Sequence, residues 1–304
     1  MKKLLITSIL SLVVFMAFGQ ASKYKTQYNL IVSKLGYDGV GIETILQNWE
    51  KVDSTDIEML TARYNYYFTK SKSSEVVKKA DKKYLGLEPI LTLKDSLGKD
   101  VYYFQETMFD DEYYSLALRA IERIILFHPE RMDMRFTKIS CLIDYEKASP
   151  DMALIQILKL IDEYPSRRGA WEIPNINLDD ETFNLAIQEY CYLLYKIGSE
   201  PSYKAFKTIS ERMLEENKKN PVFLSNLGAY HLLSSGDYKA AMKYFTKALK
   251  INKADAGAIK NILIIARKTK DTKLEKKYLP LLIKYGNEID KKSAEARLKA
   301  LNQK

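Results

Sequence analysis

Residues 234–252 read SSGDYKAAMKYFTKALKIN and contain the clearest helical pattern of the chain. Ala241, Phe245 and Ala248 follow at intervals of four and three, and the pattern ends five residues later at Lys253. This spacing puts small and large apolar side chains on one face of an α-helix. The same intervals recur twice upstream, in Ala117, Ile121, Ile124 and Pro129 and in Ala153, Ile157, Leu160 and Pro165. A spacing that occurs three times predicts a helical repeat.

Each of these helices needs a partner, because one amphipathic helix cannot bury its apolar face alone. A second pattern precedes the first, with two apolar residues, a small one and a large one at Leu224, Leu227, Gly228 and His231. It is repeated by Phe136, Ile139, Ser140 and Ile143, and approximated by Ile57, Leu60, Thr61 and Tyr64 and by Ile259, Ile262, Leu263 and Ala266. The small residue allows a close approach of the two helices. The repeating unit is therefore predicted to be a helical hairpin.

Residues 220–252, NPVFLSNLGAYHLLSSGDYKAAMKYFTKALKIN, resemble a tetratricopeptide repeat (TPR). The resemblance rests on Leu227-Gly228, Gly236-Asp237-Tyr238, Ala241, Phe245 and Ala248. This copy has one extra residue in the turn, at Ser234 or Ser235, and Lys253 where the family has proline. The stretches 24–70, 182–221 and 256–285 look like degenerate copies. The chain also looks similar to exported repeat proteins of Bacteroidota-like genomes.

The expected fold class is all-α, a right-handed α-solenoid of TPR-like helical hairpins with one inserted β-hairpin, continuous over residues 20–304. The hairpin is expected at about residues 88–105, because β-favouring residues 90–93 and 101–104 flank the turn sequence Asp95-Ser96-Leu97-Gly98. A long loop is expected at about residues 165–181, with Asp179 or Asp180 capping the next helix. Trp171 is expected to pin this loop to the body, and anchoring of a ligand is the alternative.

The first 19 residues resemble a secretory signal peptide. Lys2 and Lys3 precede an apolar run from Leu4 to Phe18, and small residues lie one and three positions before a cut at Gln20. An uncleaved membrane anchor is the alternative, although the run is shorter than the ~20 residues that span a bilayer. The expected location is therefore periplasmic or extracellular, with no stable membrane insertion after signal cleavage.

Charge is divided unevenly along the chain. Residues 202–304 contain 23 Lys and Arg against 10 Asp and Glu, a net of +13, whereas residues 20–201 contain 23 against 29, a net of −6. The lysines either form a solvated coat or mark a docking surface for an acidic partner. In the second case, Lys260 and Arg267 are expected to contribute more than Lys243 or Lys250. Nucleic acid is not expected as a partner of an exported chain.

The sequence contains no motif of a known catalytic or cofactor site. The chain has only two histidines, His128 and His231, and they form no zinc-binding motif. The sequence also contains no G-x-S-x-G motif of a serine hydrolase and no phosphate-binding loop. We therefore expect no enzyme, no cofactor and no metal. Cys141 and Cys191 are expected to be free, buried thiols rather than a disulfide.

The TPR resemblance implies a protein or peptide partner, bound in the concave groove that the first helices line. The residues expected toward or near that groove are Asn65, Tyr66, Thr137, Asp144, Ser225, Lys260 and Arg267. The predicted function is a non-catalytic protein-interaction scaffold outside the cytoplasm. Two alternatives stay open, namely a structural subunit of a cell-envelope assembly and a cryptic enzyme or small-molecule binder.

Overall fold

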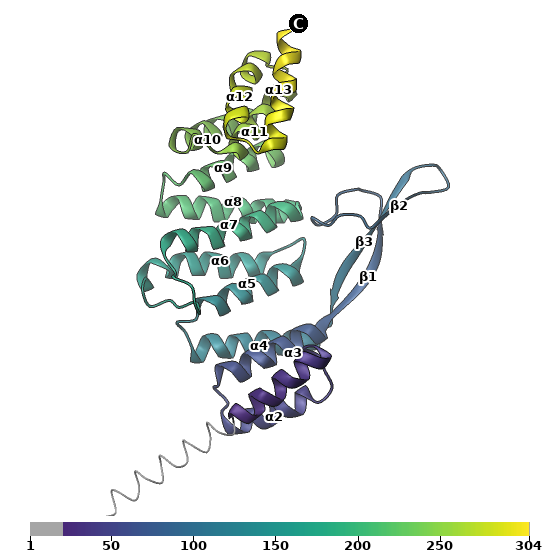
Figure 1. Ribbon diagram of the computed structural model, residues 1–304, viewed down its shortest axis with the longest axis vertical. Helices are drawn as coiled ribbons and strands as arrows, with labels where there is room; N and C mark the ends of the chain where they lie inside the picture. The colour runs from purple at the N-terminus through teal and green to yellow at the C-terminus, as the bar shows by residue number, and fades with distance from the viewer. Residues whose placement is uncertain (1–20, 304) are drawn as a thin grey trace, which may run out of the picture. The chain divides into compact units, whose positions relative to one another are not determined.

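The computed structural model describes residues 21–303, and the predicted signal peptide lies outside them (Figure 1). Within these residues the chain is mostly helical, as expected from the sequence, and its one sheet has three antiparallel strands rather than the two expected. The chain forms two compact units. Unit 1 runs to Tyr145 and includes Arg167–Leu178; unit 2 contains Glu146–Ser166 and the residues from Asp179 onward. Continuity of one solenoid through both units stays a prediction.

Unit 1 is built from helices that pack around a core rich in aromatic residues. Residues 21–35 are helical, and they are followed by α2 (Ile42–Val52), α3 (Ile57–Ser71), α4 (Asp111–Phe127) and α5 (Met132–Glu146). Trp49 is buried in this core, and its Nε1 donates a hydrogen bond to Asp56 Oδ2 at 2.9 Å. The other carboxylate oxygen of Asp56 accepts from two backbone N–H groups at the start of α3. One aspartate thereby joins the end of α2 to the cap of α3.

A three-stranded sheet is inserted between α3 and α4. Its strands β1 (Lys72–Lys79), β2 (Leu91–Lys94) and β3 (Asp100–Phe109) lie in the order β1-β3-β2, and all pairs are antiparallel. Strand β1 begins directly after α3 and β3 ends just before α4, so no flexible linker separates the sheet from the helix pair. The Asp110 N–H donates to the Ser71 carbonyl at 2.8 Å and closes the junction. The sheet therefore extends from the end of the α3/α4 hairpin as a directly attached arm (Figure 1).

The junction of the sheet and the helices is reinforced by aromatic rings and lysines. The Tyr114 and Tyr145 rings stack with centroids 4.1 Å apart. Lys72 Nζ lies 3.8 Å from the centroid of the Phe68 ring, and Lys70 Nζ lies 4.3 Å from that of Tyr113. Such contacts between a cation and the face of a ring are attractive. These contacts stabilise the attachment of the sheet to the helices of unit 1.

The predicted β-hairpin is confirmed as β2 and β3. Gly98 has φ +74°, and the Asp95 carboxylate accepts hydrogen bonds from the N–H groups of Leu97 and Lys99, as the turn sequence indicated. Strand β1 was not predicted. Its sequence, KSSEVVKK, has no alternation of apolar and polar residues because almost all of it is exposed.

The long loop expected at about residues 165–181 is present, and Trp171 holds it in place. The indole is buried, and two guanidinium groups contact it, that of Arg167 with its Cζ 4.2 Å and that of Arg135 with its Cζ 4.9 Å from the ring centroid. Backbone hydrogen bonds join Glu172 to Glu130 and Met132. The interpretation of Trp171 as a pin for this loop is confirmed. Asp179 caps the following helix, with its carboxylate accepting from the Thr182 N–H at 2.8 Å.

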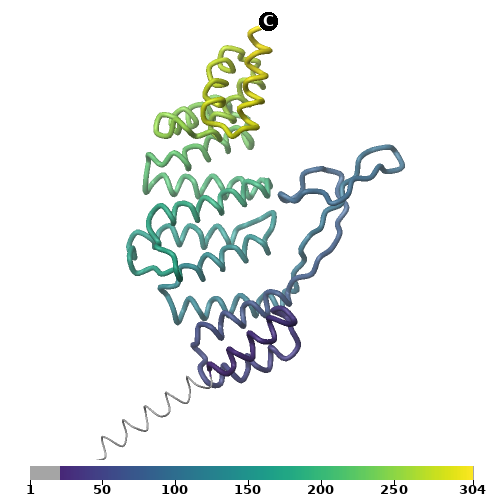
Figure 2. The backbone as a smooth tube through the Cα atoms, viewed as in Figure 1, coloured from purple at the N-terminus to yellow at the C-terminus, as the bar shows by residue number. Residues whose placement is uncertain are grey.

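Unit 2 consists of helices, and from α7 onward they are joined by short connections (Figure 2). Its α-helices are α6 (Asp151–Glu163), α7 (Asp180–Ile197), α8 (Glu200–Glu216), α9 (Pro221–Tyr230), α10 (Tyr238–Ile251), α11 (Ala256–Lys268), α12 (Thr272–Tyr285) and α13 (Glu288–Asn302). A 3₁₀ turn, η1 (Pro165–Arg167), follows α6, and a π-helical segment, η2 (His231–Ser235), follows α9. Short connections make α7/α8, α9/α10 and α11/α12 antiparallel pairs: two residues in the first, seven including η2 in the second and three in the third. We call α7, α9 and α11 first helices and α8, α10 and α12 second helices.

The pair α9/α10 shows why the small residue of the repeat matters. A Cβ atom placed on Gly228 would lie 2.6–2.9 Å from three ring atoms of Phe245, which is fully buried. The extra residue of this copy is absorbed by the π-helical segment, whose wider turn ends at Gly236 with φ +63°. His231 in this segment stacks on Tyr244, with ring centroids 5.5 Å apart. Its predicted packing role is thereby confirmed.

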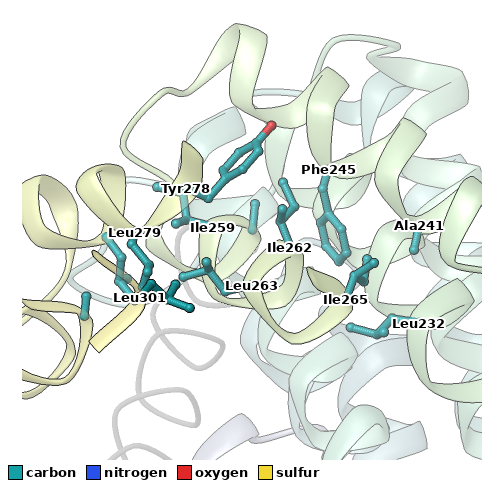
Figure 3. Packing of buried hydrophobic residues seen from close by; sticks show 13 residues of the cluster. Leu232, Ala241, Phe245, Ile259, Ile262, Leu263, Ile265, Tyr278, Leu279 and Leu301 are labelled. Atoms are coloured by element: carbon teal, nitrogen blue, oxygen red, sulfur yellow. The ribbon is translucent and has the colours of Figure 1, made fainter. Parts of the chain in front are cut away.

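Phe245 belongs to a core that joins α10 to the last three helices (Figure 3). The same core contains Ile259 and Ile262 from α11, Leu279 from α12 and Leu301 from α13. A buried charge lies among the same helices. Glu275 is only 3 % exposed at its side chain; Arg297 binds it through Nε at 2.7 Å and Nη2 at 2.8 Å, and Arg267 Nε lies at 3.2 Å. One carboxylate thereby connects α11, α12 and α13.

Replacement of Gly228 by Ala should destabilise unit 2 by about 1–3 kcal/mol, because the added methyl group overlaps the Phe245 ring. Glycine to alanine inside a helix otherwise stabilises by up to about 1 kcal/mol. Gly257→Ala on α11 is the matched control: this glycine is exposed, and an added methyl group would meet only the Asp255 side chain, at 3.2 Å, so the cost should be smaller than for Gly228→Ala. Urea unfolding followed by circular dichroism measures both. Equal effects of the two substitutions would contradict the close approach.

Replacement of Glu275 by Gln should make the protein less sensitive to acid. The hydrogen bond from Arg297 is the main cause that holds the pKa of Glu275 below its ordinary 4.5. The ionised form binds both arginines, so its stabilisation is complete above 4.5 and is lost as the pH falls through the lower pKa of the folded state. At about pH 7 the substitution should cost about 1–3 kcal/mol.

The cost should shrink by about pH 3, which lies below the ordinary pKa of 4.5, because the unfolded chain then binds the proton and the ionised carboxylate contributes less to stability. Glu200→Gln is the control: Glu200 forms an ion pair with Lys204, but its side chain is 76 % exposed, so little change is expected. Urea unfolding at the two pH values provides the comparison. A cost for Glu275→Gln that stays the same at both pH values would refute this account.

Candidate binding surface

The first helices of unit 2 carry outward-facing residues at equivalent positions. Each helix places three of them at positions i, i+3 and i+7, a spacing that follows one face of an α-helix. They are Leu185, Gln188 and Tyr192 on α7, Val222, Ser225 and Ala229 on α9, and Gly257, Lys260 and Ile264 on α11. We call these nine residues the first-helix surface.

Side-chain hydrogen bonds join neighbouring first helices next to this surface. The amides of Gln188 and Asn226 bond to each other, from Asn226 Nδ2 to Gln188 Oε1 at 2.7 Å and from Gln188 Nε2 to Asn226 Oδ1 at 3.3 Å. Ser225 donates its hydroxyl to Asp255 Oδ2 at 2.6 Å. The second oxygen of Asp255 caps α11 by accepting from the Ala258 N–H. These bonds fix α7, α9 and α11 relative to one another, so the surface is formed before any partner arrives.

The first-helix surface leaves large apolar side chains in water. Leu185 is 61 % exposed, Tyr192 50 %, Val222 41 % and Ile264 40 %. Polar groups with spare bonding capacity lie between them, because an amide has two donors and two acceptor lone pairs and the Gln188–Asn226 pair uses only part of them. Apolar anchors separated by a few fixed polar groups suit the side chains and backbone of a protein segment.

The groove residues predicted on α11 have partners within the chain. Lys260 Nζ lies 3.1 Å from Asp290 Oδ2 on α13, and Arg267 binds the buried Glu275. Both side chains are about half exposed, so they remain within reach of solvent. Their charges are nevertheless balanced by Asp290 and Glu275. Recognition of a partner by Lys260, Arg267 and Ser225 stays a prediction.

The groove residues predicted in unit 1 lie on α3 and α5. Tyr66 is buried, and its hydroxyl donates to Glu43 Oε2 at 3.3 Å; Asn65 beside it on α3 is half-buried. Thr137 on α5 donates to the Asp133 carbonyl one turn earlier, and Asp144 lies 3.8 Å from Lys72 Nζ of β1. Each of the four is thus accommodated within unit 1, and a binding role for them stays a prediction.

The residues on α7 were missed because they lie in a stretch that looked degenerate. Helix α7 has the large residue Tyr190 where the clearest copy has Leu227, and it has no glycine. Cys191, which is fully buried, occupies the place of Gly228. Reading Cys191 as the small residue would have put Leu185, Gln188 and Tyr192 in phase with Val222, Ser225 and Ala229.

The two thiols are placed for packing rather than for nucleophilic chemistry. Both are free and buried, which confirms the prediction. Burial raises the pKa of Cys141 to about 11 and that of Cys191 to about 12, so almost no thiolate forms at neutral pH. In residues 21–303, no group of three or more His, Cys, Asp or Glu side chains could hold a metal ion. No helix in the same range has the length and apolar character needed to cross a membrane.

Comparisons with known proteins give weak likenesses only. No family model matches the chain, and no curated protein matches its sequence. Among solved structures, PilF of Pseudomonas aeruginosa matches with a TM-score of 0.37 at 10 % identity, covering 92 % of this chain and 99 % of that one. The flexible tandem repeat domain of a bacterial cellulose synthase component matches with a TM-score of 0.29 at 13 % identity, covering 93 % and 98 %. At such low TM-scores neither match decides the fold or function of this chain.

Proposed function

We propose that this chain is a non-catalytic scaffold outside the cytoplasm that binds a peptide or a protein segment on the first-helix surface. One observation carries the proposal: exposed apolar side chains recur at the same helical positions, Leu185 and Val222 at the first and Tyr192 and Ile264 at the third. A soluble helix face gains nothing from such residues, because each exposed apolar group costs free energy in water. Recurrence on successive helices indicates a surface that is covered in use.

The order of residues on the surface favours an extended or helical segment. On α7 a partner would meet an apolar side chain, then a polar group, then an apolar one; α9 keeps the large apolar side chain at the first position and α11 keeps it at the third. The free energy of binding would come from burial of Leu185, Tyr192 and Ile264, at about 25 cal/mol per Å² of apolar area. The polar row of Gln188 and Ser225 would set the position of the partner backbone.

Export is part of the proposal and is supported by the sequence of residues 1–19. A cleaved signal would place the mature chain in a compartment where cell-envelope and secreted proteins are the available partners. The absence of an accessible thiolate and of a metal cluster in the described residues is compatible with a binding role. The proposal includes no cofactor.

The test uses peptides selected by phage display against the full mature chain. Selected peptides should bind the wild type and lose about tenfold in affinity for Tyr192→Ser and for Ile264→Ser, because truncation of an anchor side chain commonly costs about 1–2 kcal/mol. Ile289→Ser is the matched control, since Ile289 on α13 is 80 % exposed but lies on another helix. Isothermal calorimetry gives the affinities, and thermal unfolding shows that each variant is folded.

Two results would count against this function. Peptides that bind all three variants as well as the wild type would show that the first-helix surface is not used. A selection that returns no binding peptide, although the immobilised chain is folded, would remove the scaffold assignment for short segments.

A further inference from the structure

The second helices of unit 2 differ sharply in charge. Helix α8 contains acids and bases that neutralise each other at positions i and i+4, as in Glu200–Lys204, Lys207–Glu211 and Arg212–Glu216. Helix α10 contains no acidic residue at all. Its charged residues are Lys239, Lys243, Lys247 and Lys250. Helices α8 and α10 occupy equivalent places in neighbouring hairpins. The charges of α8 neutralise one another, whereas the charged residues of α10 are all basic.

The four lysines of α10 form a single line. They lie at positions i, i+4, i+8 and i+11, which follow one face of the helix over three turns, a length of about 16 Å. All four are exposed, and none forms an ion pair with any residue that the structure describes. We call this line the α10 lysine face. It is a row of uncompensated positive charges held by a helix whose other face is locked into the core through Ala241, Phe245 and Ala248.

Like charges at positions i and i+4 destabilise a helix by about 0.2–0.5 kcal/mol per pair. A glutamate at any of these positions would remove the repulsion, as it does on α8. The next second helix repeats the composition of α10. Exposed lysines lie at Lys273, Lys277 and Lys284 of α12, and its only acid, Glu275, is buried and bound by two arginines. The exposed part of both helices is thus free of carboxylates.

The positive charges predicted to bind a partner were those of Lys260 and Arg267, and the structure gives both of them acidic neighbours. The four lysines of α10 have no such neighbours among the described residues. We propose that the α10 lysine face binds an acidic helical segment of a partner protein, with carboxylates at i, i+4 spacing opposite the lysines. This proposal goes beyond the first-helix surface and does not depend on it.

A protein segment fits this face better than a lipid surface does. Peripheral helices that bind membranes combine basic residues with apolar side chains that enter the bilayer. The line from Lys239 to Lys250 consists of lysines, and Ile251 is the one exposed large apolar side chain of α10, so lipid binding there would rest mainly on charge. A second helix with glutamates at matching intervals can instead form several ion pairs at once, and each exposed pair contributes up to about 1 kcal/mol. Such a row also speeds association, because it attracts an acidic partner before contact.

The test uses two synthetic alanine-rich helical peptides of the same composition. One has glutamates at positions i, i+4, i+8 and i+11, and the other has the same glutamates spread around the helix. Fluorescence anisotropy measures their binding to the full mature chain at about 0.1 M and about 1 M salt, where the Debye length falls from about 10 Å to about 3 Å. The first peptide should bind at least about tenfold more tightly at low salt and lose this advantage at high salt.

Charge reversal locates the binding. Lys243→Glu/Lys247→Glu should weaken binding of the first peptide by at least about tenfold, since two attractive contacts become repulsive. The control is Lys218→Glu/Lys219→Glu, which changes the net charge of unit 2 equally at two exposed lysines between α8 and α9. Thermal unfolding verifies that both variants are folded, and Tyr192→Ser should leave this binding unchanged.

Three outcomes would overturn the proposal. Equal binding of the two peptides would show that spacing does not matter, and equal losses in the two charge-reversal variants would show an effect of net charge only. The third uses vesicles of phosphatidylcholine with and without phosphatidylserine. Binding to the anionic vesicles that depends on Lys243 and Lys247, without binding of either peptide, would identify a lipid surface instead of a protein partner.

Discussion

The separation of α9 and α10 is set by the missing side chain at Gly228, against which the ring of Phe245 packs. Much of unit 2 follows from this contact. With Phe245 in place, Leu224 and Leu227 of α9 and Ala241 and Ala248 of α10 turn inward and are buried. The rotation of each helix about its axis is then fixed. Val222, Ser225 and Ala229 must lie on one outer face of the pair and the lysines of α10 on another.

A helical hairpin with a fixed core has two outer faces, and in this chain they differ in chemistry. The first-helix surface combines apolar side chains with hydrogen-bonding groups, and bonds such as Ser225–Asp255 link successive helices. The α10 lysine face consists of charge alone. The first suits recognition by burial of apolar area, whereas the second suits long-range attraction that salt screens. A scaffold with both can attract a partner through one face and hold a segment on the other.

Much of the helical architecture could be predicted from the sequence, because it depends on local spacing. The intervals of Ala241, Phe245 and Ala248 and the small residue Gly228 define a hairpin without knowledge of distant contacts. The β2–β3 turn was equally local, since Asp95 and Gly98 supply its hydrogen bonds and its positive φ. Both cysteines were expected to be free and buried, and both are.

Other features depend on contacts that no local pattern reports. Strand β1 is paired only through β3 and exposed elsewhere, so its sequence lacks alternation. Lys260 meets Asp290, which is 30 residues away on α13, and this pairing removes the free charge expected at that position. The repeat pattern of α7 was not recognised, because Cys191 occupies the position that glycine has in α9. For β1 and Lys260 a tertiary neighbour, rather than the residue's own helix or strand, decides what the side chain does, whereas α7 was missed because its own pattern departs from that of the clearest copy.

The central claim is that a partner lies on the first helices, and site-specific photo-crosslinking in the producing cells tests it most directly. A photoreactive phenylalanine analogue would be placed at each position from 184 to 193 on α7, one variant at a time. We predict crosslinks to a protein from Leu185, Gln188 and Tyr192, with the three-to-four-residue period of one helix face, and none from Glu189 between them or from Ile289 on α13. Crosslinks without that period, or equally strong ones from Ile289, would contradict the account.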